Sequence, residues 1–373
     1  MTFGNRIAAI TSALLLVSFG ALIAVTVTDL RENARQQQGT ALKTVSLTLR
    51  STLERNGNTA LALAQVFALQ PGNVSAVATG DRGAILERLK PVYTYLNRQN
   101  GVELLQFQTA DLKTFVRVHE PQTFGDDVSQ TRPMIVAVNR VHAGQNGIEV
   151  GRYGGLSLRG VAPILQGTTL VGTAEVGLGL PDLIRAVKTR TGAEVAIVLS
   201  VGMGGQQLDK KVYGDLIVNE STDNALFARL LEVASPRLAR EDSFAEAVVD
   251  DQSWGIVVTP LLDYSGRMIG GFVAAQNFTS LHAGYRHQVW ELLFVAFAAL
   301  VICFSVIVVA MRSFVARPLS ALGDWLEALA ENRPTGDAVL PAGGADSDRI
   351  VQAATALVAR VVPVSADAKD PVK

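Results

Sequence analysis

Two long runs without a charged residue constrain this chain more than any other feature of its sequence. Residues 7–27 form a run of 21 uncharged residues, and residues 292–311 form a second run of 20. An α-helix rises 1.5 Å per residue, so either run can cross a hydrocarbon core about 30 Å thick. We therefore predict transmembrane helices over residues 7–27 and 289–311.

The first run has an alternative interpretation as a cleaved secretory signal peptide. The apolar part of a signal peptide is usually about 7–15 residues long, which is shorter than this run. Only Arg6 supplies a positive charge ahead of it. The length therefore favours an uncleaved membrane anchor.

Positive charges beside the two predicted spans indicate how the chain crosses the membrane. Arg6 precedes the first span, and Arg312 and Arg317 follow the second. Because positive residues gather on the cytoplasmic side, we expect both termini, including residues 1–6, to be cytoplasmic and residues 28–291 to lie outside. The only cysteine lies within the second span, so the exported part can form no disulfide. This is typical of a bacterial periplasm, and we predict a two-pass protein of the bacterial inner membrane.

Composition and motifs exclude several other functions. The 33 Lys and Arg residues balance 34 Asp and Glu residues, and the formal net charge is −1. A nucleic-acid partner is not expected, because binding it needs a basic surface. One cysteine and four histidines are too few for a cysteine-based zinc site or a histidine-rich metal centre. The sequence has no GxSxG motif and no P-loop. We therefore expect no metal, no cofactor and no enzymatic activity.

A helical pattern follows the first span. Apolar residues recur at steps of three, four and seven up to the helix-breaking pair Pro71-Gly72, which predicts a stalk helix over residues 28–70. Its apolar stripe must be buried, either against the rest of the same chain or against a second copy in a dimer. The stripe consists of Leu42, Val45, Leu49, Leu53, Ala60, Leu63 and Phe67.

The exported region contains two copies of one hairpin pattern. Each copy has a strand-like run with a proline, a tight turn, and a second strand-like run that begins near a glycine. Pro163 precedes Gly172 by nine residues, and Pro260 precedes Gly270 by ten. The two prolines are 97 residues apart, which is one domain length. Strand-like and helical stretches precede each hairpin in the sequence. We therefore predict an α+β fold with two small antiparallel sheets and helices on one side of each.

Charged and polar residues gather in the first of these two units. Arginine forks suit a ligand carboxylate, and an aspartate suits a ligand amine. The same side chains could instead pair with one another and fix the loops around the sheet. We expect Gly125, Gly151 and Gly160 to serve backbone turns. The candidate ligand-binding residues are Arg117, His119, Asp126, Asp127, Arg132, Glu149, Arg152 and Arg159.

The order of these residues resembles a known family. The stretch reads Phe115-Val-Arg117-Val-His119-Glu-Pro121, Phe124-Gly125-Asp126-Asp127, Arg132, Asn139, Gly147-Ile-Glu149-Val-Gly151-Arg152, Arg159-Gly160-Val161-Ala-Pro163 and Val171-Gly172-Thr-Ala-Glu175-Val-Gly177. It resembles the double Cache sensor domains of bacterial transmembrane receptors, over roughly residues 30–285. The resemblance implies two PAS-like units on the long helix, a membrane-distal unit at 71–180 and a membrane-proximal unit at 181–288. It also implies a small-molecule pocket in the distal unit.

A second resemblance lies after the second span. Leucines at 319, 322, 326 and 329 are followed by a linker and by Ile350, Ala354, Leu357 and Val361. This arrangement resembles a HAMP signal-relay module over residues 312–364, with a polar tail at 365–373. The alternative is a plain amphipathic tail. Short helices with one apolar seam need a partner surface, so we expect a parallel homodimer.

Two hypotheses for function follow. In the first, the chain is a membrane receptor whose periplasmic domain binds a small molecule and relays the signal through the HAMP-like tail. Since we find no kinase or cyclase sequence, the first hypothesis expects a separate cytoplasmic signalling protein to read that signal. In the second, the chain is a membrane-anchored scaffold that positions an organelle or a cytoskeletal protein, as a magnetosome-positioning protein does.

Overall fold

The computed structural model describes residues 3–151, 155–201, 211–234 and 236–330, and the single residues 349, 352, 353 and 356. These residues belong to two compact units. The spanning-helix unit comprises Met1–Glu32 and Tyr285–Lys373, and the sheet unit comprises Asn33–Gly284. Each is described by itself.

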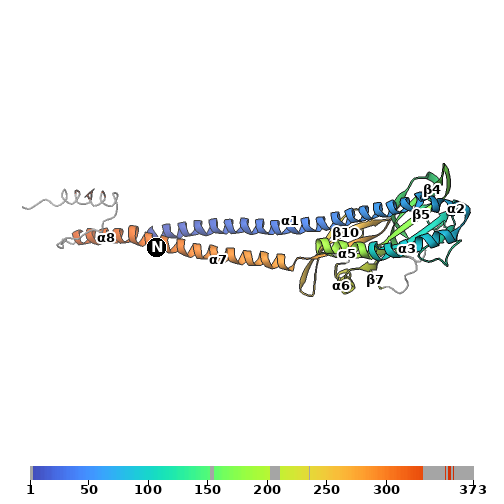
Figure 1. Ribbon diagram of the computed structural model, residues 1–373. Coiled ribbons are helices and arrows are strands. Elements are labelled where there is room, and N and C mark those ends of the chain that lie inside the picture. The colour runs from blue at the N-terminus through green and yellow to red at the C-terminus, as the bar shows by residue number, and fades with distance from the viewer. Residues whose placement is uncertain are drawn as a thin grey trace, which may run out of the picture. The chain divides into compact units, whose positions relative to one another are not determined.

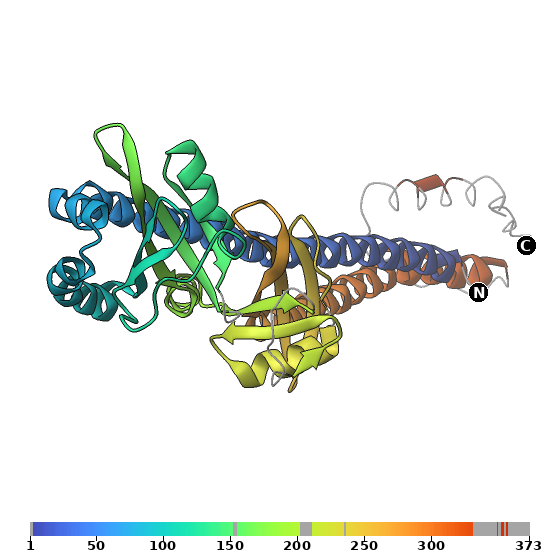
Figure 2. The ribbon, with the colours of Figure 1, turned by 90° about the vertical axis from the view of Figure 1, so that its right-hand side faces the viewer.

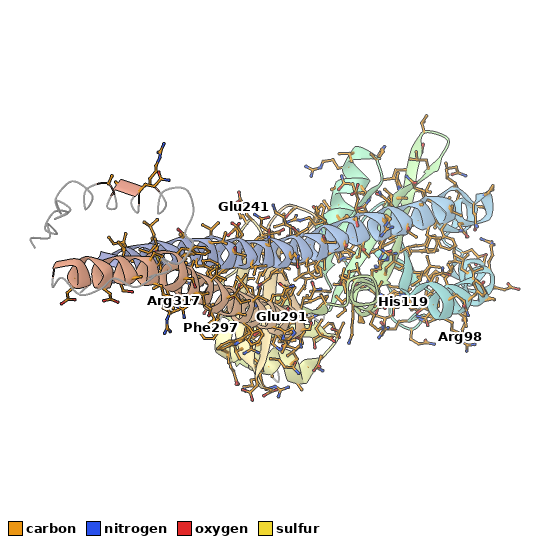
Figure 3. All side chains as sticks on the ribbon, turned by 90° about the vertical axis from the view of Figure 1, so that its left-hand side faces the viewer. Arg98, His119, Glu241, Glu291, Phe297 and Arg317 are labelled. Atoms are coloured by element: carbon orange, nitrogen blue, oxygen red, sulfur yellow. The ribbon has the colours of Figure 1, made fainter. Side chains whose placement is uncertain are left out.

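The spanning-helix unit contains the two apolar runs. The N-terminal part of helix α1 (Phe3–Leu69) and most of helix α7 (Thr279–Ala310) are long and apolar enough to cross a membrane. Large apolar side chains on both are exposed: Leu14 is 65% exposed and Phe294 is 74% exposed. Exposed apolar side chains on such helices are suited to contact with lipid. A π-helical turn (Met311–Ala316) and helix α8 (Arg317–Ala330) follow α7, and Figure 3 labels Phe297 and Arg317 along this path.

The sheet unit begins with the rest of α1 and contains the first sheet. The strand order is β2-β1-β5-β4-β3, and all the pairings are antiparallel. Strands β4 and β5 form the first predicted hairpin (Figure 2). The elements are α2 (Pro71–Thr79), α3 (Arg82–Asn100), β1 (Val102–Thr109), β2 (Thr114–Arg117), α4 (Pro133–Val141), β3 (Gln145–Val150), β4 (Leu156–Gln166) and β5 (Thr169–Gly179).

The second sheet follows in the same unit. Its strand order is β7-β8-β6-β11-β10-β9, again antiparallel, and β10 with β11 forms the second predicted hairpin. The prediction of a repeated hairpin within an α+β fold is therefore confirmed. The elements are α5 (Leu180–Thr191), β6 (Glu194–Ser200), β7 (Val212–Tyr213), β8 (Leu216–Ser221), α6 (Asn224–Ala234), β9 (Ser243–Val249), β10 (Gln252–Leu262) and β11 (Met268–Asn277).

Helix α1 buries its apolar stripe within the chain. Leu42, Val45 and Leu49 pack into a core with the second sheet, and Ala60 and Phe67 pack into a core with the first. Figure 1 shows α1 running beside both sheets. Of the two expected uses of the stripe, the structure shows packing against the chain's own sheets.

The two faces of the first sheet differ in chemistry. Side chains alternate along a strand, so Ala162 and Ile164 of β4 face the apolar core with α1, while Val161 faces a separate small core with α4. Helix α4 thus covers the face opposite to α1. The expectation that helices lie on one side only is wrong for both sheets. In the first sheet, α4 closes part of the face on which polar residues alternate with apolar ones. In the second, α5 and α6 belong to separate cores on opposite faces.

Gly160 corrects a second expectation. We expected a backbone turn, but Gly160 lies inside strand β4. A Cβ atom at this position would lie 2.1 Å from the backbone nitrogen of Leu61 in α1, so the strand and the helix can touch only where the side chain is a hydrogen atom.

Candidate ligand-binding site

A cavity of about 300 Å³ lies on the polar face of the first sheet. Strands β1, β2 and β4 supply one part of its lining, and the loop between β2 and α4 supplies another. Five of the eight predicted site residues line it: Arg117, His119, Asp126, Arg132 and Arg159. The fold thus brings together residues that are up to 42 positions apart in the sequence.

Arg117 and Asp126 form a paired rim of this cavity. The Arg117 guanidinium donates two parallel hydrogen bonds to the Asp126 carboxylate, with N–O distances of 2.7 and 2.8 Å, and a third to the Thr123 carbonyl oxygen at 3.0 Å. Hydrogen bonds from Arg117 and its charge lower the pKa of Asp126 to about 2. The pair therefore stays ionised at neutral pH and fixes the loop from Thr123 to Asp126.

A buried arginine–glutamate cluster forms the floor: Arg132, Glu149, Arg159 and Glu175. All four side chains are buried, and Glu175 is completely so. Arg132 Nε donates to Glu149 Oε2 (2.8 Å), and Arg159 Nη1 donates to Glu175 Oε1 (2.7 Å). Arg132 Nη2 also pairs with Glu175 Oε1. Two positive and two negative charges balance here, as burial of charge requires.

The arginines control the ionisation of Glu175. Burial alone raises the pKa of this carboxyl, but the charges and hydrogen bonds of Arg132 and Arg159 outweigh burial and hold it at about 2. The side-chain amides of Gln106 and Gln108 donate to Glu175 Oε2, the latter at 3.1 Å. The hydroxyl of Thr173 donates in turn to Gln108 Oε1 at 2.6 Å. Glu175 is thus a fixed carboxylate that orients both arginines.

Two residues that line the cavity each have a buried polar atom without a partner among the described residues. Arg159 Nε and Ser157 Oγ are buried, and neither makes a hydrogen bond within the described parts of the chain. Both residues line the cavity. Because buried donors are nearly always satisfied in folded proteins, these two atoms are unused hydrogen-bonding groups within residues that line the cavity.

His119 lines the cavity as a neutral imidazole. Burial lowers its pKa, and its Nδ1 lies 3.2 Å from the carbonyl oxygen of Leu105. That distance identifies Nδ1 as the protonated nitrogen, because the carbonyl can only accept. The ring lies beside Tyr93, with centroids 6.3 Å apart, and is labelled in Figure 3.

The other three predicted residues have different positions. Glu149 belongs to the cluster beneath the cavity wall. Asp127 is exposed and does not line the cavity, and its carboxylate accepts the backbone N–H of Ser129 at 2.8 Å. Arg152 lies outside the described residues.

Glu175, Gln106, Gln108 and Ser157 were missed as site residues. The sequence holds a signal for Glu175: it is the only charged residue in the apolar strand β5. An acid at the centre of a strand that must be buried needs a cationic partner, but its position in the sequence does not say which arginine supplies it.

A second cavity, of about 610 Å³, lies at the second sheet. Its lining includes Asp215 and Arg237, which are exposed, and apolar Leu216 and Leu238. The first cavity has the stronger character of a binding site despite its smaller volume, because buried charged groups converge on it.

A long helix carrying two small antiparallel sheets, with a polar cavity on the first, defines a class of sensory domains in membrane proteins. The chain belongs to the double Cache family: the family model described as the double sensory domain of two-component sensor kinases matches residues 35–282. Apolar helices flank this domain on both sides. The protein is therefore a membrane-anchored Cache sensor protein of signal transduction.

Several solved structures are similar in fold. The ligand-binding domain of the Campylobacter jejuni chemoreceptor Tlp3 in complex with L-valine is 12% identical, with 68% of this chain and 95% of that chain covered and a TM-score of 0.41. The sensor domain of the Vibrio cholerae histidine kinase DctB is 10% identical, with 66% and 98% covered and a TM-score of 0.40. The Escherichia coli DcuS sensor domain is 17% identical, with 37% and 98% covered and a TM-score of 0.31. No curated protein matches the sequence.

Proposed function

We propose that this protein is a transmembrane receptor that binds a small polar molecule in the cavity of the first sheet. The observation that carries the proposal is the convergence of Arg117, Arg132, Arg159 and Asp126 on one cavity in a chain of the Cache family. A volume of about 300 Å³ lies at the small end of ligand pockets, which favours a metabolite over a larger molecule.

The chemistry of the cavity favours a ligand with a carboxylate. Arg159 Nε offers a buried donor without a partner, and Ser157 Oγ lies on the same strand. Arg117 at the rim adds a guanidinium, and Asp126 can accept from an amine. The arginines also pair with carboxylates of the chain. Ligand binding and internal pairing, the two alternatives drawn from the sequence, are therefore compatible, because the internal pairs can hold the guanidinium groups in the orientation that a ligand needs.

The experiment is a thermal-shift screen of the full chain in lipid nanodiscs against amino acids, amines and small organic acids. A ligand present at about 100 times its Kd adds about 2.7 kcal/mol to the stability of the folded chain. We expect a hit whose shift is lost in Asp126→Asn. Asp127→Asn is the matched control, because this neighbouring carboxylate is exposed and does not line the cavity.

The outcome also separates the receptor from the scaffold hypothesis. A compound that raises the melting temperature of both variants equally would place the binding site elsewhere. The absence of any hit across the three compound classes would favour the scaffold, which needs no ligand.

The finer parts of the receptor hypothesis are also proposals. We infer that the protein lies in the bacterial inner membrane, with the sheet unit outside the cytoplasm and both termini inside it. Positive residues precede the first apolar run and follow the second, and such residues gather on the cytoplasmic side. We infer a parallel homodimer that relays the signal to a cytoplasmic signalling protein through residues 312–364. Most of the second HAMP-like helix lies outside the described residues.

The homodimer has a direct test in membranes. Single cysteines at Leu322 or Leu326, in a Cys303→Ser background, should crosslink between two chains, because both positions belong to the proposed seam. A cysteine at Asp324, which is exposed, is the control and should crosslink much less. Equal crosslinking at the three positions would contradict a defined helical seam.

A further inference from the structure

The turn between β10 and β11 is a rigid tip. The Asp263 carboxylate accepts the backbone N–H groups of Ser265 and Arg267, at 2.9 and 3.0 Å, and Gly266 has the positive φ of +80° that closes the turn. The Asp263 N–H donates to the Arg267 carbonyl oxygen at 2.9 Å. With its backbone fixed in this way, the tip can transmit force instead of absorbing it.

This tip of the second sheet docks onto the first sheet. The backbone N–H of Tyr264 donates to the carbonyl oxygen of Ile148 in β3 at 2.9 Å. Strand β3 is the edge of the first sheet, so its outer carbonyl groups are free to accept such a bond. A Cβ atom at Gly147 would lie 2.6 Å from Tyr264 Cβ, which means that only glycine admits the tyrosine so closely. Tyr264 also packs against the small core beside α4.

Glu149, the residue after Ile148, holds an arginine of the cavity floor in place. Glu149 Oε2 accepts from Arg132, which lines the cavity, and Glu149 Oε1 accepts the Met134 backbone N–H at the start of α4 (3.0 Å). Three consecutive residues of β3 therefore admit the tip, bond to it and hold a cavity arginine. The negative charge of Glu149 also contributes to raising the pKa of the Tyr264 phenol, after burial, which agrees with their proximity.

The other end of the tip leads out of the domain. Strand β11 is hydrogen-bonded on both sides, by β10 and by β6, so it is a stiff inner strand. It ends at Asn277, and Phe278 follows with its backbone N–H on the Ser253 carbonyl oxygen (2.8 Å) and its side chain in the core. Helix α7 begins at the next residue, Thr279, and continues without a break into the apolar run.

We propose that the Asp263–Arg267 tip is the mechanical link between the ligand cavity and helix α7. This inference rests on the proposed receptor function. A molecule that shifts Arg132 moves Glu149 and strand β3, and the docked Tyr264 carries that displacement through β11 to the start of α7. Because coupling between sites is reciprocal, a change at the tip must also reach the cavity floor.

Hydrogen exchange of the full chain in lipid nanodiscs tests this link without any ligand. Glu149→Gln weakens the bond to Arg132 but keeps an acceptor for the Met134 N–H. We expect it to speed exchange at least about threefold in residues 263–270 and 279–284. Tyr264→Ala removes the ring from the small core beside α4 but keeps the backbone N–H, so in that background the same change should have a smaller effect in those residues. In the reverse direction, Tyr264→Ala alone should speed exchange in β3 and in the first turn of α4.

Two controls accompany these variants. Tyr264→Phe keeps the ring and removes only the hydroxyl, so it should behave as the wild type. Tyr95→Ala removes a tyrosine that is 66% exposed in the same unit. The link is refuted if Glu149→Gln leaves the exchange of residues 263–270 and 279–284 unchanged, or if its effect there is the same with and without the Tyr264 ring. If Glu149→Gln does not fold, the reverse direction decides, and wild-type exchange in β3 and α4 of Tyr264→Ala refutes the link. Neither result depends on the ligand screen, so the two proposals can fail separately.

Discussion

The two sheets share one hairpin plan but use the face opposite to α1 differently. When Pro163 is aligned with Pro260, and Gly172 with Gly270, Arg159 corresponds to Ile256 and Glu175 corresponds to Val273. The register agrees, since Val161 pairs with Glu175 in the first hairpin and Val258 pairs with Val273 in the second. A buried ion pair in one sheet therefore replaces two apolar side chains in the other.

This difference shows how one plan yields both a site and a scaffold. Ile256 and Val273 belong to an apolar core packed by α6, while Val257 and Phe272 face a second apolar core, so the second sheet is apolar on both faces. The first sheet keeps an apolar face toward α1 and places charges on the other, where the cavity lies. A polar face cannot be closed by apolar packing, which leaves room for a ligand.

The largest effect is expected from removing the carboxylate that the second sheet lacks. Glu175→Ala leaves Arg132 and Arg159 buried without their shared partner, and breaking a buried pair in this way costs about 3–5 kcal/mol. Val273→Ala, at the corresponding position, should cost less, because it removes only two carbon atoms. Chemical denaturation of the full chain, followed by circular dichroism, measures both. Equal losses in the free energy of unfolding would contradict an additional cost of leaving the two arginines unpaired.

Converting the first sheet toward the second sharpens the same comparison. In the double variant Arg159→Ile, Glu175→Val, no carboxylate is left unpaired by the exchange and Arg132 keeps Glu149. We expect it to recover at least about 1 kcal/mol relative to Glu175→Ala, since apolar replacements of buried pairs are often neutral. It should also lose any ligand-induced thermal shift. Binding that persists in this variant would remove Arg159 from the site.

Gly160 offers a second difference between the sheets, because the corresponding residue is the buried Val257. Gly160→Ala should destabilise the chain by about 1–3 kcal/mol, since the added methyl group meets the backbone of α1 at 2.1 Å and that backbone cannot move aside. Gly39→Ala in α1 is the control: it has open space around it and should be neutral or slightly stabilising. Denaturation midpoints report both, and a neutral Gly160→Ala would mean that β4 does not touch α1 so closely.

The smallest effect concerns pH. The pKa values of Asp126 and Glu175 are about 2 in the folded chain and about 4 in an unfolded one, so their pairs stabilise the folded state above about pH 4. This stabilisation is lost as the pH falls from about 4 toward 2. Asp126→Asn should therefore cost about 1 kcal/mol at pH 6, and the cost should shrink at pH 3. Urea titrations at the two pH values test this, and a constant cost would contradict the depressed pKa.

The sequence by itself determined the elements and the family. Apolar runs, helical spacing and alternating strands are local patterns, and they predicted both spans, the stalk stripe from Leu42 to Phe67, and both hairpins. Burial of an apolar face is required wherever the pattern occurs, so no knowledge of the partner was needed. The charged and glycine positions between Phe115 and Gly177 indicated the Cache family, because the order of residues in a motif can be read along the chain.

Only the tertiary structure decided which polar residues form the site. Asp126 and Asp127 are adjacent in the sequence, yet one pairs with Arg117 at the cavity and the other caps an exposed loop. Glu175 meets Arg159 because β5 lies beside β4, and it meets Arg132 because α4, which follows that arginine, packs on the same face of the sheet. Gly147 meets Tyr264 across 117 residues of chain. Such pairings depend on strand order and on close contact between distant segments, and a short stretch of sequence contains no record of either.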